Sequence, residues 1–259
     1  MLRILVVVAA AVLSGCAGFF PQSAQVTPQR PTFSSNTATT AEGTLELEAG
    51  GAIDPGDSID TPLVAKWGTG PGTELFAGWS PLQYLERPGP DGLGVSDLVL
   101  GTRHRFIEAG DGTPSMAVQL ATKLPSGDSS EGLSTDQIDF NLAAILTQTF
   151  GSLEATVYYN AGFLGQGVGD PNLQHTLALA AGLPINDRIG VFGELTGIIE
   201  HERSLEEYYF IGGATYSSEP GVMFDLGARI GLNDDAADFA LLFGFTTNFG
   251  PASSWGGGE

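Results

Sequence analysis

The sequence contains little cysteine and little positive charge. A single cysteine among 259 residues excludes a disulfide framework and a zinc site built from several thiolates. Ten Lys and Arg stand against 30 Asp and Glu, which gives a formal net charge of −20. A nucleic-acid-binding protein needs clustered basic side chains to neutralise phosphates, so this balance argues against that class. Charged residues are only 15% of the chain, whereas about 25% is usual for a soluble domain.

The apolar run at the start of the chain, Ile4 to Leu13, is too short for a transmembrane helix. Ten helical residues span about 15 Å, which is half of the hydrocarbon core of a bilayer. Because Arg3 precedes the run, it predicts a signal peptide over residues 1–15 and therefore export of the chain.

The residues Leu13-Ser14-Gly15-Cys16 resemble the bacterial lipobox, in which the cysteine is acylated and becomes the mature N-terminus. We therefore expect a lipid on Cys16; the alternative is an ordinary signal peptide that is cut beside Ala17. Residues 16–42 are rich in Pro, Gln, Ser and Thr and show no apolar period. They predict a flexible periplasmic segment.

From residue 43 to residue 249 the dominant signal is an alternation of apolar and polar residues, and no stretch has a convincing helical period. Most of the alternating segments are longer than the five or six residues of a usual soluble strand, and nine to eleven residues suffice to cross a bilayer when tilted. We predict an all-β protein, a closed antiparallel transmembrane β-barrel of about twelve strands over 43–249, followed by a C-terminal tail, 250–259. The predicted strands are 44–53, 62–68, 73–79, 95–107, 114–124, 136–150, 152–162, 172–183, 188–199, 206–217, 221–232 and 238–249.

The connections alternate between tight turns and longer loops, as in barrels of the bacterial outer membrane. An even number of strands places both chain ends on the short-turn side, which is the periplasm. A soluble barrel or a β-sandwich is the competing architecture. Its outer face would need many charges, whereas the polar faces here are mostly Gly, Thr and Asn with scattered charges.

Sorting each strand by its apolar face leaves a set of charged residues that are predicted to line the pore. Eight acids and five bases give the lumen a slight cation preference. They select solutes by charge, as rings of charged side chains do in pores, or they brace the wall as salt bridges and leave no open path. Lys66 with Arg103 and Arg105 is the first choice for a selectivity element. The set is Glu46, Glu48, Lys66, Glu74, Asp97, Arg103, Arg105, Lys123, Asp139, Glu154, Glu194, Asp225 and Arg229.

An enzyme is not expected. The histidines, His104, His175 and His201, fall on different strands or a loop, and no Ser-His-acid site can be assembled from them. The acidic turns at 54–60 and 233–238 lack the ligand spacing of an EF-hand and are explained by turn chemistry. The sequence therefore predicts no cofactor and no metal.

A series of segments occurs in order along the chain: Gln29 to Phe33 (QRPTF), Gly43 to Gly50 (GTLELEAG), Gly94 to Phe106 (GVSDLVLGTRHRF), Ala121 to Gly127 (ATKLPSG), Leu183 to Glu194 (LPINDRIGVFGE), Gly212 to Tyr216 (GGATY) and Gly231 to Phe249. Their order and spacing resemble the outer-membrane protein family named for the meta-pathway of phenol degradation. The resemblance implies a β-barrel that moves small, often aromatic, compounds across the outer membrane, and it supplies no catalytic residue. The chain departs from the family in Cys16 and in the ten residues that follow Phe249.

The expected function is a porin-like channel or transporter for a small, aromatic or hydrophobic solute in the bacterial outer membrane. The expected partners are outer-membrane lipid, the solute, and the barrel-assembly and lipoprotein-sorting machineries, with no nucleic acid. Two alternatives stay open: a structural or surface-interaction lipoprotein with a plugged barrel, and a periplasmic lipoprotein with a soluble β-barrel.

Overall fold

The structure is a computed structural model that describes residues 25–86, 91–110, 112–165, 172–202, 204–219 and 221–251. Nearly all of the regular structure is β. None of the helical structure within these residues has the length and apolarity that a bilayer crossing requires. The elements are β1 Thr44–Asp54, β2 Ser58–Asp60, β3 Leu63–Gly70, β4 Thr73–Trp79, β5 Gln83–Leu85, β6 Gly92–Gly94, β7 Leu98–Ile107, β8 Ser115–Leu124, the 3-10 helix η1 Ser129–Glu131, β9 Asp139–Phe150, β10 Leu153–Leu164, β11 Asn172–Pro184, β12 Ile189–Glu200, β13 Leu205–Glu219, β14 Val222–Gly231 and β15 Phe239–Pro251.

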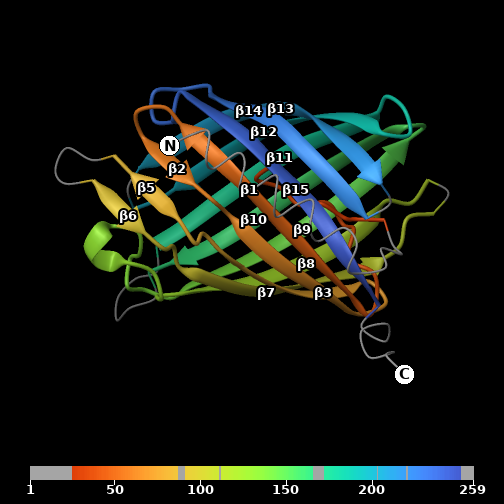
Figure 1. The fold of residues 1–259 in the computed structure, drawn as a ribbon, viewed down its shortest axis with the longest axis horizontal. Helices are drawn as coiled ribbons and strands as arrows, with labels where there is room; N and C mark the ends of the chain where they lie inside the picture. Colours follow the sequence, from red (N-terminus) through yellow and green to blue (C-terminus); the bar gives the residue numbers. More distant parts are fainter. Residues whose placement is uncertain are drawn as a thin grey trace.

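The strands form a closed antiparallel barrel of 12 strands, as the alternation predicts (Figure 1). The barrel strands pair in the order β1, β3, β4, β7 and then β8 to β15 in sequence, and β15 closes the barrel by pairing with β1 from Ile53↔Leu241 to Leu45↔Phe249. Closure leaves no barrel edge in need of a hydrogen-bonding partner, which a bilayer could not supply.

Three short strands at one end of the barrel were not expected as separate elements. They form a small antiparallel sheet in the order β2-β5-β6, in which β2 pairs with the C-terminal end of β1. The breaks that separate them from β3, β4 and β7 lie at residues 61–62, 80–82 and 95–97, where Pro and Ser interrupt the alternation. The longer connections gather at this end, the long-loop end, and the tight connections gather at the other, the short-turn end.

The two faces of the wall have opposite chemistry. Large apolar side chains point outward and are exposed; along β10, for instance, they are Leu153, Val157, Tyr159 and Phe163. The alternate residues point inward and are mainly small, polar or charged. This arrangement is what a lipid-facing wall needs, and it contradicts the soluble barrel, whose apolar faces would point inward.

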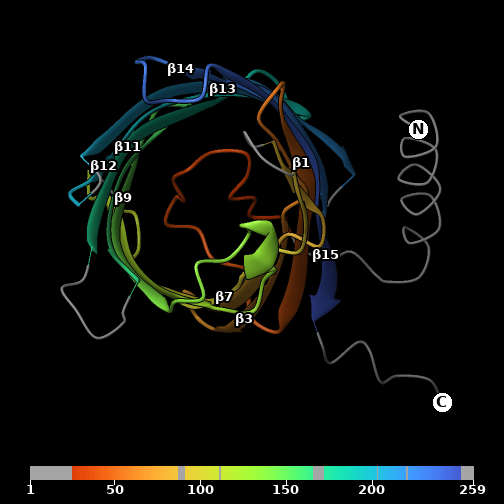
Figure 2. The ribbon, with the colours of Figure 1, turned by 90° about the vertical axis from the view of Figure 1, so that its left-hand side faces the viewer.

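The segment before the barrel differs most from its expectation. The sequence predicts a flexible periplasmic segment over 16–42, whereas its described part, residues 25–42, lies inside the lumen (Figure 2). Val26, Ser34 and Thr37 are buried there. The physical reason is that carboxylates of the wall supply the acceptors that this polar chain otherwise finds only in water. We call residues 25–42 the luminal segment.

The outer face leads to the first prediction. Leu179 is 52% exposed and lies halfway along β11 between the outward Val157 and Leu195, whereas Leu183 lies near the turn to β12. Leu179→Arg should lower the free energy of unfolding by about 2–4 kcal/mol, and Leu183→Arg by about 0–1 kcal/mol, because the cost of a charge depends on its depth in the bilayer. Urea unfolding in phospholipid vesicles measures both, and equal losses would contradict a membrane-embedded wall.

Candidate functional site

Four inward glutamates hold the luminal segment through its main-chain N–H groups. Each glutamate is at most 1% exposed, so water does not replace these partners. Hydrogen bonds to a carboxylate are stronger than neutral ones, and a buried carboxylate without a partner is costly. The bonds are Thr27 N to Glu46 Oε2 (2.9 Å), Gln29 N to Glu48 Oε1 (3.0 Å), Phe33 N to Glu194 Oε1 (2.9 Å), Ser34 N to Glu194 Oε2 (3.0 Å) and Thr40 N to Glu74 Oε2 (2.7 Å).

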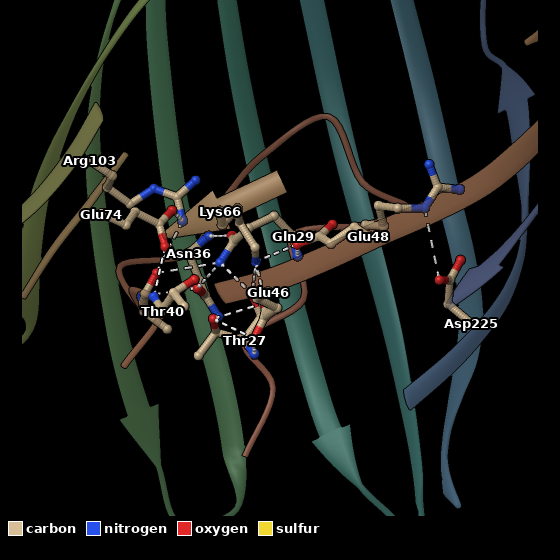
Figure 3. A network of polar contacts seen from close by, with 12 residues as sticks. Thr27, Gln29, Asn36, Thr40, Glu46, Glu48, Lys66, Glu74, Arg103 and Asp225 are labelled. Carbon is tan, nitrogen blue, oxygen red and sulfur yellow. Dashed lines mark hydrogen bonds and ion pairs between the residues drawn. The ribbon is translucent and has the colours of Figure 1, made fainter. Parts of the chain in front are cut away.

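Lys66 forms ion pairs with two of these glutamates. Its Nζ lies 2.5 Å from Glu46 Oε1, contacts Glu48, and donates to the carbonyl oxygen of Thr27 at 2.6 Å (Figure 3). Three partners use the three donors of an ammonium group. The wall and the luminal segment are therefore joined in one network, in which a single cation bridges two carboxylates.

Arg103, on β7, links the wall to the luminal segment in the same way as Lys66. Its guanidinium lies 3.3 Å from Glu74 and donates to the carbonyl oxygen of Ala38 at 3.0 Å. Two further bonds, of 3.1 and 2.7 Å, go to the side-chain oxygen of Gln119. Arg103 thus fixes a second point of the luminal segment through an ion pair within the wall.

The contact of Arg30 is looser. Its Nε lies 4.0 Å from Asp225, and its Nη2 donates to the carbonyl oxygen of Phe243 at 3.1 Å. The side chain occupies space left by Gly50 and Gly244, which face each other across β1 and β15; a Cβ at either position would collide with the guanidinium. Arg30 Nε and Asp225 Oδ1 are buried without a hydrogen-bond partner among the described residues.

The other predicted charged residues also lie on the inner side of the wall or at its rim. Each has a partner, and several of them lie nearer the barrel ends. The pairs are Lys123 with Asp97 (3.3 Å) and with Asp139 (2.8 Å), Arg229 with Asp54 (2.8 Å), Arg105 with Glu108 (3.1 Å), and Glu154 with the Asn36 amide (3.1 Å).

The proposed selectivity element is only partly assembled. Lys66 and Arg103 line the same cavity, but Arg105 does not line it and pairs with Glu108 beside a short turn. The residue spacing places Arg103 and Arg105 on one face, yet two residues along a strand carry Arg105 toward the end of the barrel. Lys66 and Arg103 also form ion pairs with glutamates, so neither is a free cation.

Two cavities remain beside the luminal segment. One, of about 370 Å³, reaches the turn at 186–188 on the short-turn end. The other, of about 380 Å³, reaches Pro62, Ser80 and Asp97 toward the long-loop end. Both are lined by Gln29, Arg30 and Thr32. The luminal segment therefore separates two spaces that would otherwise be continuous at that point.

Asp97 ties a long loop to the wall. Its carboxylate accepts from the N–H groups of Ser126 (3.0 Å) and Gly127 (2.9 Å). Burial alone raises the pKa of the Asp97 carboxyl, but hydrogen bonds from the Ser134 hydroxyl and the Gly127 N–H, together with Lys123, lower the pKa overall. The group therefore remains charged and anchors the connection between β8 and β9.

Sequence reasoning missed the residues of the luminal segment and Asp54. The segment contains Gln29 to Phe33, the first of the family-like stretches, and that stretch was the available signal that it is structured.

His175 lies beside Tyr159, with 2.8 Å between Nδ1 and the hydroxyl oxygen, and its ring meets that of His201 edge-on. Within the described residues, no group of three or more His, Cys, Asp or Glu is placed to hold a metal. Cys16 lies outside the described residues.

The charge network yields a stability prediction. Lys66→Met leaves Glu46 and Glu48 buried without a cation, and such a loss costs about 3–5 kcal/mol in the free energy of unfolding. Lys123→Met is the matched control, because Lys123 also bridges two carboxylates but is 19% exposed. Urea unfolding should show a clearly smaller loss for the control. Equal losses would mean that water reaches the Lys66 site as well.

Comparison with solved structures gives barrels of the outer-membrane type. The COG4313 outer membrane channel from Pseudomonas putida F1 superposes with a TM-score of 0.66 at 10% identity, over 85% of this chain and 100% of that one. The NanC porin gives a TM-score of 0.55 at 11% identity, over 78% of this chain and 98% of that one. At such identities the likeness shows the fold alone. Among curated proteins, no sequence relative matches the chain.

The match to a family model covers most of the chain. Residues 24–249 match the family described as "Putative MetA-pathway of phenol degradation". The matched region includes the whole luminal segment and ends within β15. The resemblance noted in the sequence is thus confirmed, and the chain belongs to this family.

Proposed function

We propose that the protein is an outer-membrane channel through which small solutes pass by diffusion. The observation that carries this is the pair of cavities in the lumen, about 370 and 380 Å³, which approach the two ends of the barrel and share Gln29, Arg30 and Thr32. Twelve strands enclose a narrow lumen that side chains can easily fill. Here they do not fill it, and the fold is shared with a channel and a porin.

The solute class that we propose is a small aromatic or other hydrophobic compound. The family description, which refers to phenol degradation, supports it. The cavity toward the long-loop end supports it as well, because Val64, Phe76 and Val99 give it an apolar wall beside the charged Lys66 and Arg103. A compound with one polar group and an apolar body matches such a lining.

The proposed topology places the short turns and both chain ends in the periplasm. A lipid on Cys16 would then insert into the inner leaflet of the outer membrane, close to the point where the chain enters the barrel. Export, lipoprotein sorting and barrel assembly would each act on the chain. No catalytic step is proposed.

A second candidate is a structural or surface-interaction protein with a permanently plugged barrel. The observation that favours it is the network around Lys66, in which the luminal segment and the wall share buried ion pairs and hydrogen bonds. Passage of solute distinguishes the two candidates.

The channel function is tested with the full-length protein in liposomes. Folding is verified first, by a shift between unboiled and boiled samples on a denaturing gel. Liposomes that contain the folded protein should then swell faster than empty liposomes in an isotonic solution of a small phenol or a small sugar. A heat-modifiable protein that leaves the swelling rate unchanged for every solute would favour the plugged structural barrel.

The lipid anchor has its own test. Cells that express the protein should incorporate labelled palmitate into it, and Cys16→Ser should abolish the label because Cys16 is the chain's only thiol. The variant's barrel should still require detergent for extraction, since its outer face carries the exposed apolar residues. Label retained in the variant would place the modification elsewhere.

A further inference from the structure

Glu194 differs from the other glutamates that hold the luminal segment. It lies on β12 and is 1% exposed, and none of the described Lys or Arg side chains forms an ion pair with it. Its partners are the Phe33 and Ser34 N–H groups, the Ser34 hydroxyl, and the hydroxyl of Thr196 at 2.8 Å. Three of its four donors therefore belong to the luminal segment, and all four are neutral.

A buried charge is normally paired with an opposite charge or met by several donors. Glu194 meets this need only while the luminal segment is in place. If the segment left, three donors would leave with it, and a carboxylate would face the lumen with only Thr196 beside it. Water or a cation would then take the vacated positions.

Arg30 forms a looser ion pair with the wall than Lys66 does. Its 4.0 Å contact with Asp225 is longer than the contacts of Lys66, and both groups keep a buried atom without a hydrogen-bond partner among the described residues. Arg30 also lines both cavities. A loosely held residue of the segment therefore lies where its movement would join the two spaces.

We propose that residues 25–42 form a displaceable gate and that Glu194, which they cover, makes the opened lumen select cationic solutes. This rests on the proposed function, because a gate has meaning only if the barrel passes solutes. Displacement removes the positive charge of Arg30 from Asp225 and the donors from Glu194, whereas Lys66 and Arg103 stay on the wall beside their own glutamates. The carboxylates left without a cation attract cations, as acidic rings do in cation channels.

A disulfide tests the gate. The side-chain oxygens of Thr37, in the luminal segment, and Ser115, on β8, lie 2.5 Å apart, so a Thr37→Cys/Ser115→Cys pair is placed to form a cross-link. The pair is built in the full-length chain with Cys16→Ser, so that no other thiol competes. Each single-cysteine variant is the control. Folding of every variant is checked by its heat-modifiable migration.

Currents are recorded in planar bilayers under a KCl gradient. Oxidation should abolish the openings of the double-cysteine protein, reduction should restore them, and the single-cysteine controls should not respond. If the cross-linked protein opens as often as the reduced one, solute passes beside a fixed segment and the gate is wrong while passage stands. If the folded wild-type and reduced proteins never conduct and the liposomes do not swell, passage itself is wrong, and the gate with it.

Glu194→Gln tests the selectivity and does not depend on the cross-link. The variant should open more often, because a neutral amide holds the N–H groups less strongly, and its reversal potential should shift toward zero. Glu194→Asp keeps the charge and should keep the cation preference. Asp139→Asn removes a carboxylate that pairs with Lys123 on the wall rather than with the luminal segment, and it should leave the opening frequency unchanged. Unchanged openings and an unchanged reversal potential in Glu194→Gln would overturn the role of Glu194.

Discussion

The lumen is organised by the need of its buried carboxylates for partners. Glu46, Glu48, Glu74 and Glu194 are almost entirely removed from water, although they face the inside of a barrel in which water could be expected. Two cations of the wall, Lys66 and Arg103, neutralise only part of this negative charge. Main-chain N–H groups supply the rest, and a polar segment of the same chain is what brings those groups into the lumen.

The outer wall obeys a different and less adjustable constraint. In the hydrocarbon core no solvent can satisfy a free N–H or C=O group, so the sheet must close on itself, and the alternate residues must be apolar. The pairing of β15 with β1 satisfies the first condition, and exposed residues such as Leu177 and Leu226 satisfy the second. The wall cannot open without exposing free N–H and C=O groups to lipid. Any conformational change that lets solute through must therefore take place in the segment inside the lumen.

The wall could be predicted from the sequence, whereas the contents of the lumen could not, and both outcomes have the same physical reason. Strand alternation is a local signal, and each strand shows it within ten residues. The luminal segment has no such period, since its contacts with the wall are hydrogen bonds to several separate strands, some of them far away in the sequence: Phe33 to Glu194 spans 161 positions. The inward acids could be identified from the strands, but their partners could not. For the same reason the spacing of Arg103 and Arg105 predicted their common face, but it did not predict that Arg103 lines the cavity toward the long-loop end while Arg105 pairs with Glu108.

The chemistry of the luminal segment also fits a part that moves. A plug held by apolar contacts would expose its hydrophobic surface on leaving, and the cost would grow with the area exposed. The luminal segment is held mainly by hydrogen bonds to carboxylates, and both sides of such bonds can be satisfied by water, so the net cost of exchange is far below the strength of the bonds themselves. Phe33 is an exception, since it packs against the cluster of Ile211, Ala240 and Leu242 and under the guanidinium of Arg229. Such an apolar contact gives the segment a defined resting position, while the polar contacts can be exchanged for water when it is released.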